Sequence, residues 1–211
     1  MASLNVSNQQ QTCFVFDFGG VLFDWSPYYL FNQYFNNDKQ AVDHFLADIE
    51  FAAFNLEQDK GRPFDEAVAE MTEKFPQYEA ALQAYDRDWV VMFGGAIKST
   101  VDILASIKQA GYPLYALSNW SVDKFDLIKP GQDFLDWFED IVLSGEEKIA
   151  KPDPRIFSIF LERAGRKAEE CLFIDDSKGN IIAADKLGFN TILYESPEQL
   201  KSELQRRGFL N

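Results

Sequence analysis

Short runs of consecutive apolar residues recur along the chain, and each run ends where a polar or charged side chain follows. Unbroken apolar runs of this length are typical of strands that are buried on both faces, as strands are in parallel sheets. Apolar residues at helical spacing fill most of the sequence between these runs. The predicted strands are Phe14–Phe16, Leu114–Leu117, Ile141–Leu143, Cys171–Ile174 and Thr191–Tyr194.

In the second half of the chain, helical patterns alternate with these strands. Their N-termini carry a capping side chain followed by proline at Asp153-Pro154 and Ser196-Pro197. Strands that alternate with helices predict an α/β fold built on a parallel sheet. The predicted helices run from about Ile97 to Ala110, from Pro154 through Leu161, from Lys178 to Leu187, and onward from Pro197.

The segment between the first two strands has a different pattern, because it is helical throughout. Its apolar residues form stripes at helical spacing, which predicts four helices in an insert of roughly 70 residues. Gly94-Gly95 follows the last stripe and is interpreted as a hinge or linker. The predicted organisation is therefore a core of residues 12–25 and 96–211, a helical cap of residues 26–95, and a disordered, Gln-rich N-terminus at residues 1–11.

The four predicted helices of the insert can be assigned from their stripes and breakers. The first carries Tyr29 to Phe35, the second Val42 to Ala53, the third runs from Phe64 to about Lys74, and the fourth extends from Pro76 through Trp89 and Met92.

Composition narrows the classes of function. The chain of 211 residues is 46% hydrophobic and carries a net charge of −14, a field that repels nucleic acid and anionic membranes. Cys13 and Cys171 lie on predicted core strands and are interpreted as buried, reduced thiols. The sequence has no secretory signal and no apolar run of membrane length, so a cytoplasmic location is expected. With His44 as the single histidine, the chemistry must rest on carboxylates, hydroxyls and lysines.

The first strand ends at Asp17, and Gly19-Gly20 follows at once. Glycines let the chain turn sharply and let its backbone approach a ligand closely. The carboxyl ends of parallel strands are where open α/β sheets bind ligands. Taken alone, the sequence leaves two interpretations open, a ligand-binding carboxylate or an Asp that caps a turn. Asp24, seven residues later, is either a catalytic acid or a residue that fixes the strand-to-helix turn.

Three later stretches place further polar groups at predicted strand ends. Ser118 and Asn119 follow the second strand. They form either a simple turn or contacts for a phosphate or other oxyanion, and Trp120 would line the same binding site. Lys151 lies in the sequence Lys-Pro-Asp-Pro, as an exposed loop lysine or as a counter-charge to nearby carboxylates. Asp175 and Asp176 follow the fourth strand, and such adjacent carboxylates stay ionised most easily around a divalent cation.

In this order, the four stretches resemble the four motifs of the haloacid dehalogenase-like hydrolase superfamily, over nearly the whole chain after residue 12. The position of the helical insert resembles the C1-capped branch, subfamily I. The resemblance implies a Rossmann-like three-layer core with a cap domain. It also implies that Asp17 is a nucleophile that forms a covalent aspartyl intermediate, and that Ser118 and Lys151 bind phosphoryl oxygens.

The resemblance further implies a Mg²⁺ site formed by Asp17, the backbone carbonyl of Gly19 and Asp176, with Asp175 orienting the metal's waters. Asn119 and Trp25 are candidates for substrate contact, and Arg62 and Arg87 are weaker ones because surface ion pairing is the commoner role of such arginines. The implied partner is a small phosphorylated metabolite, for a protein that is a monomer or a homodimer.

Gly19 departs from the family's phosphatases, which usually carry a second Asp there as general acid and base. Without this acid, either the substrates have leaving groups that depart readily, such as anomeric sugar phosphates or acyl phosphates, or the protein hardly turns over. A group resembling α-D-glucose-1-phosphate phosphatase shares this Gly, which supports the first possibility. Three hypotheses follow: a Mg²⁺-dependent phosphatase, a metal-independent 2-haloacid dehalogenase, or a non-catalytic binding or regulatory protein. The paired acids Asp175 and Asp176 count against the dehalogenase, and the missing acid motivates the third.

Overall fold

The computed structural model describes residues 12–210, so the disorder expected for residues 1–11 lies outside the described part of the chain. A five-stranded sheet forms its centre, with strand order β5-β4-β1-β6-β7 and every neighbouring pair parallel. The predicted α/β fold with a parallel sheet is confirmed. The strands are β1 (Cys13–Phe16), β4 (Leu114–Ser118), β5 (Asp140–Leu143), β6 (Cys171–Asp175) and β7 (Asn190–Leu193).

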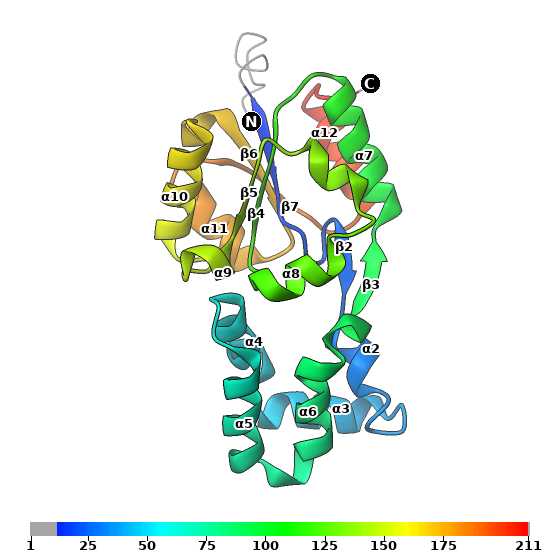
Figure 1. The fold of residues 1–211 in the computed structure, drawn as a ribbon. Helices are drawn as coiled ribbons and strands as arrows, with labels where there is room; N and C mark the ends of the chain where they lie inside the picture. Colours follow the sequence, from blue (N-terminus) through cyan, green and yellow to red (C-terminus); the bar gives the residue numbers. More distant parts are fainter. Residues whose placement is uncertain (1–11, 211) are drawn as a thin grey trace.

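Helices cover both faces of this sheet (Figure 1). Alternate residues of β1 pack against the helices on opposite faces. Phe14 and Phe16 belong to the core cluster that includes residues of α7 and α12. Cys13 and Val15 belong to the opposite cluster, with residues of α10 and α11. The unbroken apolar run of β1 is thus explained by burial on two faces. The helices are α7 (Lys98–Gln109), α10 (Pro154–Ala164), α11 (Lys178–Lys186) and α12 (Pro197–Arg206).

The helix starts follow the predicted capping chemistry. The Asp153 carboxylate accepts a hydrogen bond from Arg155 N at the start of α10, and the Ser196 hydroxyl accepts one from Gln199 N at the start of α12. A proline occupies the first turn in both cases, where no backbone N–H is needed.

The insert between β1 and β4 forms a helical group set apart from the sheet (Figure 1). The predicted stripe from Val42 to Ala53 is not one helix, because Glu50 adopts the left-handed conformation (φ 49°) and divides it. The predicted first helix ends at Phe31, and turns occupy residues 32–37. The prediction of four helices is therefore wrong in count, since five α-helices are present: α2 (Pro27–Phe31), α3 (Lys39–Asp48), α4 (Phe51–Asp59), α5 (Phe64–Lys74) and α6 (Glu79–Arg87).

Two antiparallel strands connect the sheet to the helical group, β2 (Phe23–Trp25) and β3 (Phe93–Ala96). Gly94-Gly95, predicted as a hinge or linker, therefore lies in a strand. A Cβ at Gly94 would approach Asp24 Oδ2 to 2.5 Å, and Gly95 has a φ of +101°, so both positions require glycine for packing or backbone conformation. Asp24 accepts a hydrogen bond from the Tyr29 hydroxyl (2.7 Å), as expected of a residue that fixes this turn.

Polar contacts join the helical group to the core. Lys124 Nζ of α8 bonds both the carboxylate and the backbone oxygen of Asp86 in α6, and it lies over the Phe64 ring at 4.3 Å from the centroid. The remaining elements are α8 (Val122–Ile128), α9 (Ser144–Glu147) and short 3-10 turns at Pro76–Tyr78, Trp89–Met92, Asp133–Trp137 and Ala168–Glu170.

Across residues 12–210, each helix is too short or too polar to cross a lipid bilayer.

Candidate active site

The carboxyl ends of β1, β4 and β6 bring Asp17, Ser118 and Asp175 together, and the loop before α10 adds Lys151. Asp17 Oδ1 accepts hydrogen bonds from Ser118 Oγ (2.7 Å) and from the backbone N–H of Phe18 (2.7 Å). Lys151 Nζ lies 3.1 Å from the same oxygen and 2.7 Å from Asp175 Oδ2. Parallel strands explain this convergence, because their ends meet at one edge of the sheet.

Lys151 is the cation at the centre of this group. It is only 1% exposed, and its Nζ also donates to the backbone oxygen of Leu117 (2.7 Å). Burial alone would lower the pKa of Lys151, but the negative charges of Asp17 and Asp175 outweigh it and raise the pKa above the ordinary value. Lys151 therefore stays charged, and the interpretation as an exposed loop lysine does not fit its position.

Burial has a different outcome for Asp17, because it favours the neutral, protonated form of this carboxyl. Its burial raises its pKa to about 7, because Lys151 offsets only part of the cost of desolvation and Asp175 adds a like charge. A carboxylate with a raised pKa is stabilised by any further cation that binds beside it.

Asp175 and Asp176 lie beside Asp17 but differ in what they already bind. One oxygen from each of the three carboxylates lies within 4.8 Å of the others. Asp175 is fully buried, and its oxygens accept hydrogen bonds from Ser177 N, Asn180 Nδ2 and Lys151 Nζ. Asp176 is exposed. Asp175 is therefore placed to hold its neighbours in position, whereas Asp176 is open to a ligand.

The loop after β1 approaches Asp176 closely. Gly20 has a φ of +73°, and a Cβ there would lie 2.4 Å from Asp176 Oδ2, so only glycine fits. Three clustered carboxylates and adjacent bare backbone form a set of hard oxygen donors, which suits Mg²⁺. The raised pKa of Asp17 is consistent with a place for a cation here. Asp17, Asp176 and the carbonyl of Gly19 are the residues that would hold it.

Asn119, predicted to contact substrate, is bonded instead to the backbone of Lys151. Its Oδ1 accepts from Lys151 N (2.8 Å), and its Nδ2 donates to Lys151 O (2.9 Å). Both ends of the amide are thus used to position the lysine, although the residue also lines the cavity described next. Arg62 and Arg87 pair with Glu70 and Asp88, as expected of surface arginines.

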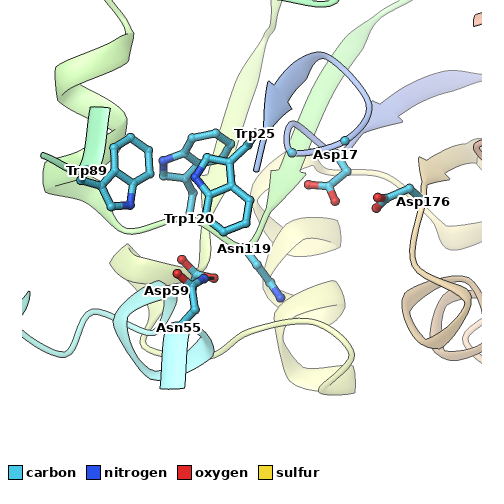
Figure 2. A pocket seen from close by; sticks show the side chains of 10 residues that line it. Asp17, Trp25, Asn55, Asp59, Trp89, Asn119, Trp120 and Asp176 are labelled. Carbon is cyan, nitrogen blue, oxygen red and sulfur yellow. Dashed lines mark hydrogen bonds between the residues drawn. The ribbon is translucent and has the colours of Figure 1, made fainter. Parts of the chain in front are cut away.

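A cavity of about 240 Å³ opens over Asp17, between the sheet edge and the helical group (Figure 2). Asp17 and Asp176 lie at one side of it, and three tryptophans, Trp25, Trp89 and Trp120, line another part. The third side is formed by polar residues of the insert, Asn55 and Asp59 of α4.

Sequence reasoning placed Trp25 and Trp120 near the site but missed Asn55, Asp59 and Trp89. The available signal was the polar pair Asn55 and Asp59, four residues apart on a mainly apolar helix, which therefore lies on one face. That pair carries no motif, and only the fold shows that its face meets Asp17.

A family model described as haloacid dehalogenase-like hydrolase matches residues 12–188. The D-ribitol-5-phosphate phosphatase of Bacteroides thetaiotaomicron is 23% identical over 197 residues, which cover 90% of this chain and 95% of that protein. A crystal structure of a HAD family enzyme from the same organism, in complex with magnesium and inorganic phosphate, superposes with a TM-score of 0.68 at 26% identity. It covers 87% of this chain and 94% of the other.

Other relatives match over shorter stretches. The (S)-2-haloacid dehalogenase 4A of Burkholderia cepacia is 33% identical over 98 residues, 46% of this chain and 42% of that protein. Acyl-CoA dehydrogenase family member 10 of Mus musculus is 41% identical over 68 residues, which are 32% of this chain and 6% of that protein. The chain thus spans a small part of some relatives and nearly the full length of others.

Proposed function

The chain belongs to the haloacid dehalogenase-like hydrolases, and from that premise we propose that it is a Mg²⁺-dependent phosphatase of a small phosphorylated metabolite. Relatives that match over most of the chain include a phosphatase, and a similar enzyme binds magnesium and phosphate. The observation that carries the proposal is that Asp17 and the open carboxylate Asp176 line one side of a cavity, while the buried Lys151 pairs with Asp17 from behind that side.

Asp17 is the proposed nucleophile. Its Oδ1 is held by Ser118, Lys151 and the N–H of Phe18, while Oδ2 has no hydrogen bond within the described residues. The carboxylate is therefore fixed in orientation with one oxygen available to attack phosphorus. Attack would form an aspartyl phosphate, and water would then release phosphate and restore Asp17.

The other core residues are proposed to hold the phosphoryl group. The Ser118 hydroxyl and the Lys151 ammonium lie beside Asp17 Oδ1, so they would contact phosphoryl oxygens as these approach. Mg²⁺ held by Asp17, Asp176 and the carbonyl of Gly19 would supply further positive charge to an anionic transition state. In phosphoryl transfer, such positioning and charge stabilisation provide most of the catalysis.

The cavity walls favour an oxygen-rich substrate of modest size. The indole Nε1 atoms of Trp25 and Trp120 are buried without a hydrogen-bond partner among the described residues. Buried donors are normally satisfied, and oxygens of a bound substrate are one source of acceptors. A sugar phosphate or similar polyol phosphate suits these walls and the volume of about 240 Å³.

The test is a screen of phosphate monoesters with Mg²⁺ and with a chelator present. We expect phosphate release from at least one small ester with Mg²⁺ and little with the chelator. The dehalogenase alternative is favoured by Gly19 and by the haloacid dehalogenase match, and predicts halide release from 2-haloacids without metal. If neither phosphate nor halide is released from any compound, the non-catalytic alternative would be favoured.

Affinity for Mg²⁺ is expected to rise with pH. The pKa of Asp17 is raised to about 7, so a proton competes with the cation below that value, and competition ends as the pH rises above it. For one competing proton, the affinity should increase about tenfold between pH 6 and pH 8. Isothermal titration of the substrate-free protein in buffers of different ionisation enthalpy measures both the affinity and the released proton.

The matched control for this titration is Asp17→Asn, which removes the competing proton. In that variant the affinity is expected to be weak and to vary less with pH. A wild-type affinity that is constant from pH 6 to pH 8 would show that no proton on Asp17 competes with the cation in this range.

A further inference from the structure

The side of the cavity opposite Asp17 has a chemical requirement of its own. Displacement at phosphorus is in line, so the leaving oxygen lies on the side of phosphorus away from the attacking Asp17 oxygen. Gly19 has no side chain to give that oxygen a proton. For a leaving group that needs a proton, a side-chain donor would come from the wall that faces Asp17, where Asn55 and Asp59 of α4 lie (Figure 2).

The core fixes the position of Asp59 through its backbone. Asp59 is the last residue of α4, and its carbonyl oxygen accepts a hydrogen bond from Ser144 Oγ of α9. The same Ser144 hydroxyl oxygen accepts a hydrogen bond from Trp120 N (2.9 Å), next to the strand end that carries Ser118. Asp59 thus belongs to the insert in sequence but is anchored to the catalytic edge of the sheet.

The Asp59 side chain is also oriented. Its Oδ2 accepts from Asn55 Nδ2 (2.8 Å), and Asn55 Oδ1 accepts from the hydroxyl of Tyr85 (2.7 Å), which is fully buried. Tyr85 thereby sets which end of the Asn55 amide faces Asp59. Within residues 12–210, Asp59 Oδ1 has no hydrogen bond, and no lysine or arginine pairs with this carboxyl, so Oδ1 is free to face a ligand.

These surroundings favour the protonated form. Desolvation raises the pKa of Asp59 well above its usual range, the negative charge of Asp17 raises it further, and only the Asn55 hydrogen bond opposes them. A bound phosphate ester would add negative charge in the same direction. Asp59 therefore holds a proton at a pH where an ordinary Asp is ionised, as a general acid must.

We propose that Asp59 is the general acid and base of this phosphatase, in the role that Gly19 cannot fill. As Asp17 forms its bond to phosphorus and the ester P–O bond breaks, Asp59 gives its proton to the leaving oxygen. The resulting carboxylate then takes a proton from the water that attacks the aspartyl phosphate, and the P–O bond to Asp17 breaks. Phosphate leaves, and both carboxyl groups return to their initial states.

This inference rests on the proposed phosphatase function, and its test compares leaving groups. Asp59→Asn keeps the shape and neutrality of the protonated carboxyl, so it is expected to fold. On alkyl phosphates, whose leaving groups need a proton, kcat/KM should fall by about 10²–10⁴. The leaving group of 4-nitrophenyl phosphate departs without a proton donor. The value of kcat/KM includes only the steps up to formation of the phosphoenzyme, so on this substrate it should change by less than about threefold.

Glu73→Gln is the matched control, since it removes an exposed carboxylate of the insert away from the cavity and should leave the whole series unchanged. A gain of function provides a second check, because a Cβ at Gly19 would meet only Trp120 at 3.7 Å. Adding Gly19→Asp to Asp59→Asn should therefore restore alkyl phosphate hydrolysis by an expected factor of about 10 or more.

Equal losses on alkyl and nitrophenyl phosphates in Asp59→Asn would overturn the assignment and leave Asp59 as a binding residue. The wild-type series provides an independent test if that variant fails to fold. With a general acid, the wild-type kcat/KM depends weakly on the pKa of the leaving group, whereas a steep dependence would rule the acid out. Failure of the proposed function is a different result, namely no phosphate release that requires Asp17.

Discussion

Asp17→Asn is expected to abolish phosphate release, with kcat/KM lowered by at least about 10⁴-fold, the scale seen when a catalytic nucleophile is removed. The amide of asparagine is a poor nucleophile, and it cannot form the aspartyl phosphate on which the proposed route depends. The hydrogen bond from Ser118 and the ion pair of Lys151 with Asp175 remain available. Phosphate release by purified wild type and variant, with Mg²⁺ present, measures the effect.

The matched control is Asp24→Asn, which removes another carboxylate from the same stretch of sequence. Asp24 bonds the Tyr29 hydroxyl and lies outside the lining of the cavity, so activity should change by no more than about twofold. Thermal unfolding shows whether both variants remain folded. Substantial turnover by folded Asp17→Asn would exclude an aspartyl phosphate on this residue.

The strand ends were predictable from sequence because two patterns coincide there. β1, β4 and β6 are apolar runs that stop at a polar residue, so their existence and ends are well defined. Asp17 follows β1, whereas Ser118 and Asp175 are the last residues of β4 and β6. A parallel sheet gathers such ends at one edge whatever the intervening sequence is. Sequence therefore predicted the core of the candidate site, including the place of Lys151 near these carboxylates.

The insert was predicted less well because its local signals are weaker than its tertiary contacts. Apolar residues continue in helical register across Glu50, so nothing in the pattern indicates the left-handed turn that separates α3 from α4. That turn directs α4 so that Asn55 and Asp59 reach the cavity. Glycines at Gly94-Gly95 indicated a linker, whereas pairing with β2 makes them part of strand β3.

In the role proposed for Asp59, the wall opposite Asp17 would supply the acid that the family's motif lacks here. A proton donor for the leaving oxygen needs a position on that wall, and the backbone segment from which it comes is immaterial. Here the residue two positions after the nucleophile is Gly19, and the carboxyl of Asp59 lies across the cavity from Asp17 instead. The absence of an acid at residue 19 is therefore weak evidence against catalysis.

Lys151→Met is expected to lower both stability and activity. Methionine has a similar shape, but without the ammonium the carboxylates of Asp17 and Asp175 face each other, and the backbone oxygen of Leu117 loses its donor. Removing one partner of a buried ion pair typically costs about 3–5 kcal/mol of unfolding free energy. For a chain of this length, that loss lowers the Tm by roughly 10 °C.

The pH dependence of this loss has a definite sign. Lys151 lowers the pKa of Asp17, so the variant raises that pKa beyond about 7, and its folded state binds a proton more tightly than the unfolded chain does. The stability cost should therefore be largest near pH 8 and should shrink as the pH falls towards 5. Denaturant unfolding at several pH values, with a chelator present, measures it.

Lys124→Met is the matched control for burial of a lysine. Lys124 is also buried, but its partner Asp86 keeps a side chain that is 37% exposed, so water can solvate the carboxylate left behind and the cost should be near 1 kcal/mol. Adding Asp175→Asn to Lys151→Met should recover part of the lost stability, because it removes one of the two opposed charges. Equal costs for the two lysine variants would contradict the central place given to Lys151, since they would mean that Asp17 and Asp175 do not depend on it for charge compensation.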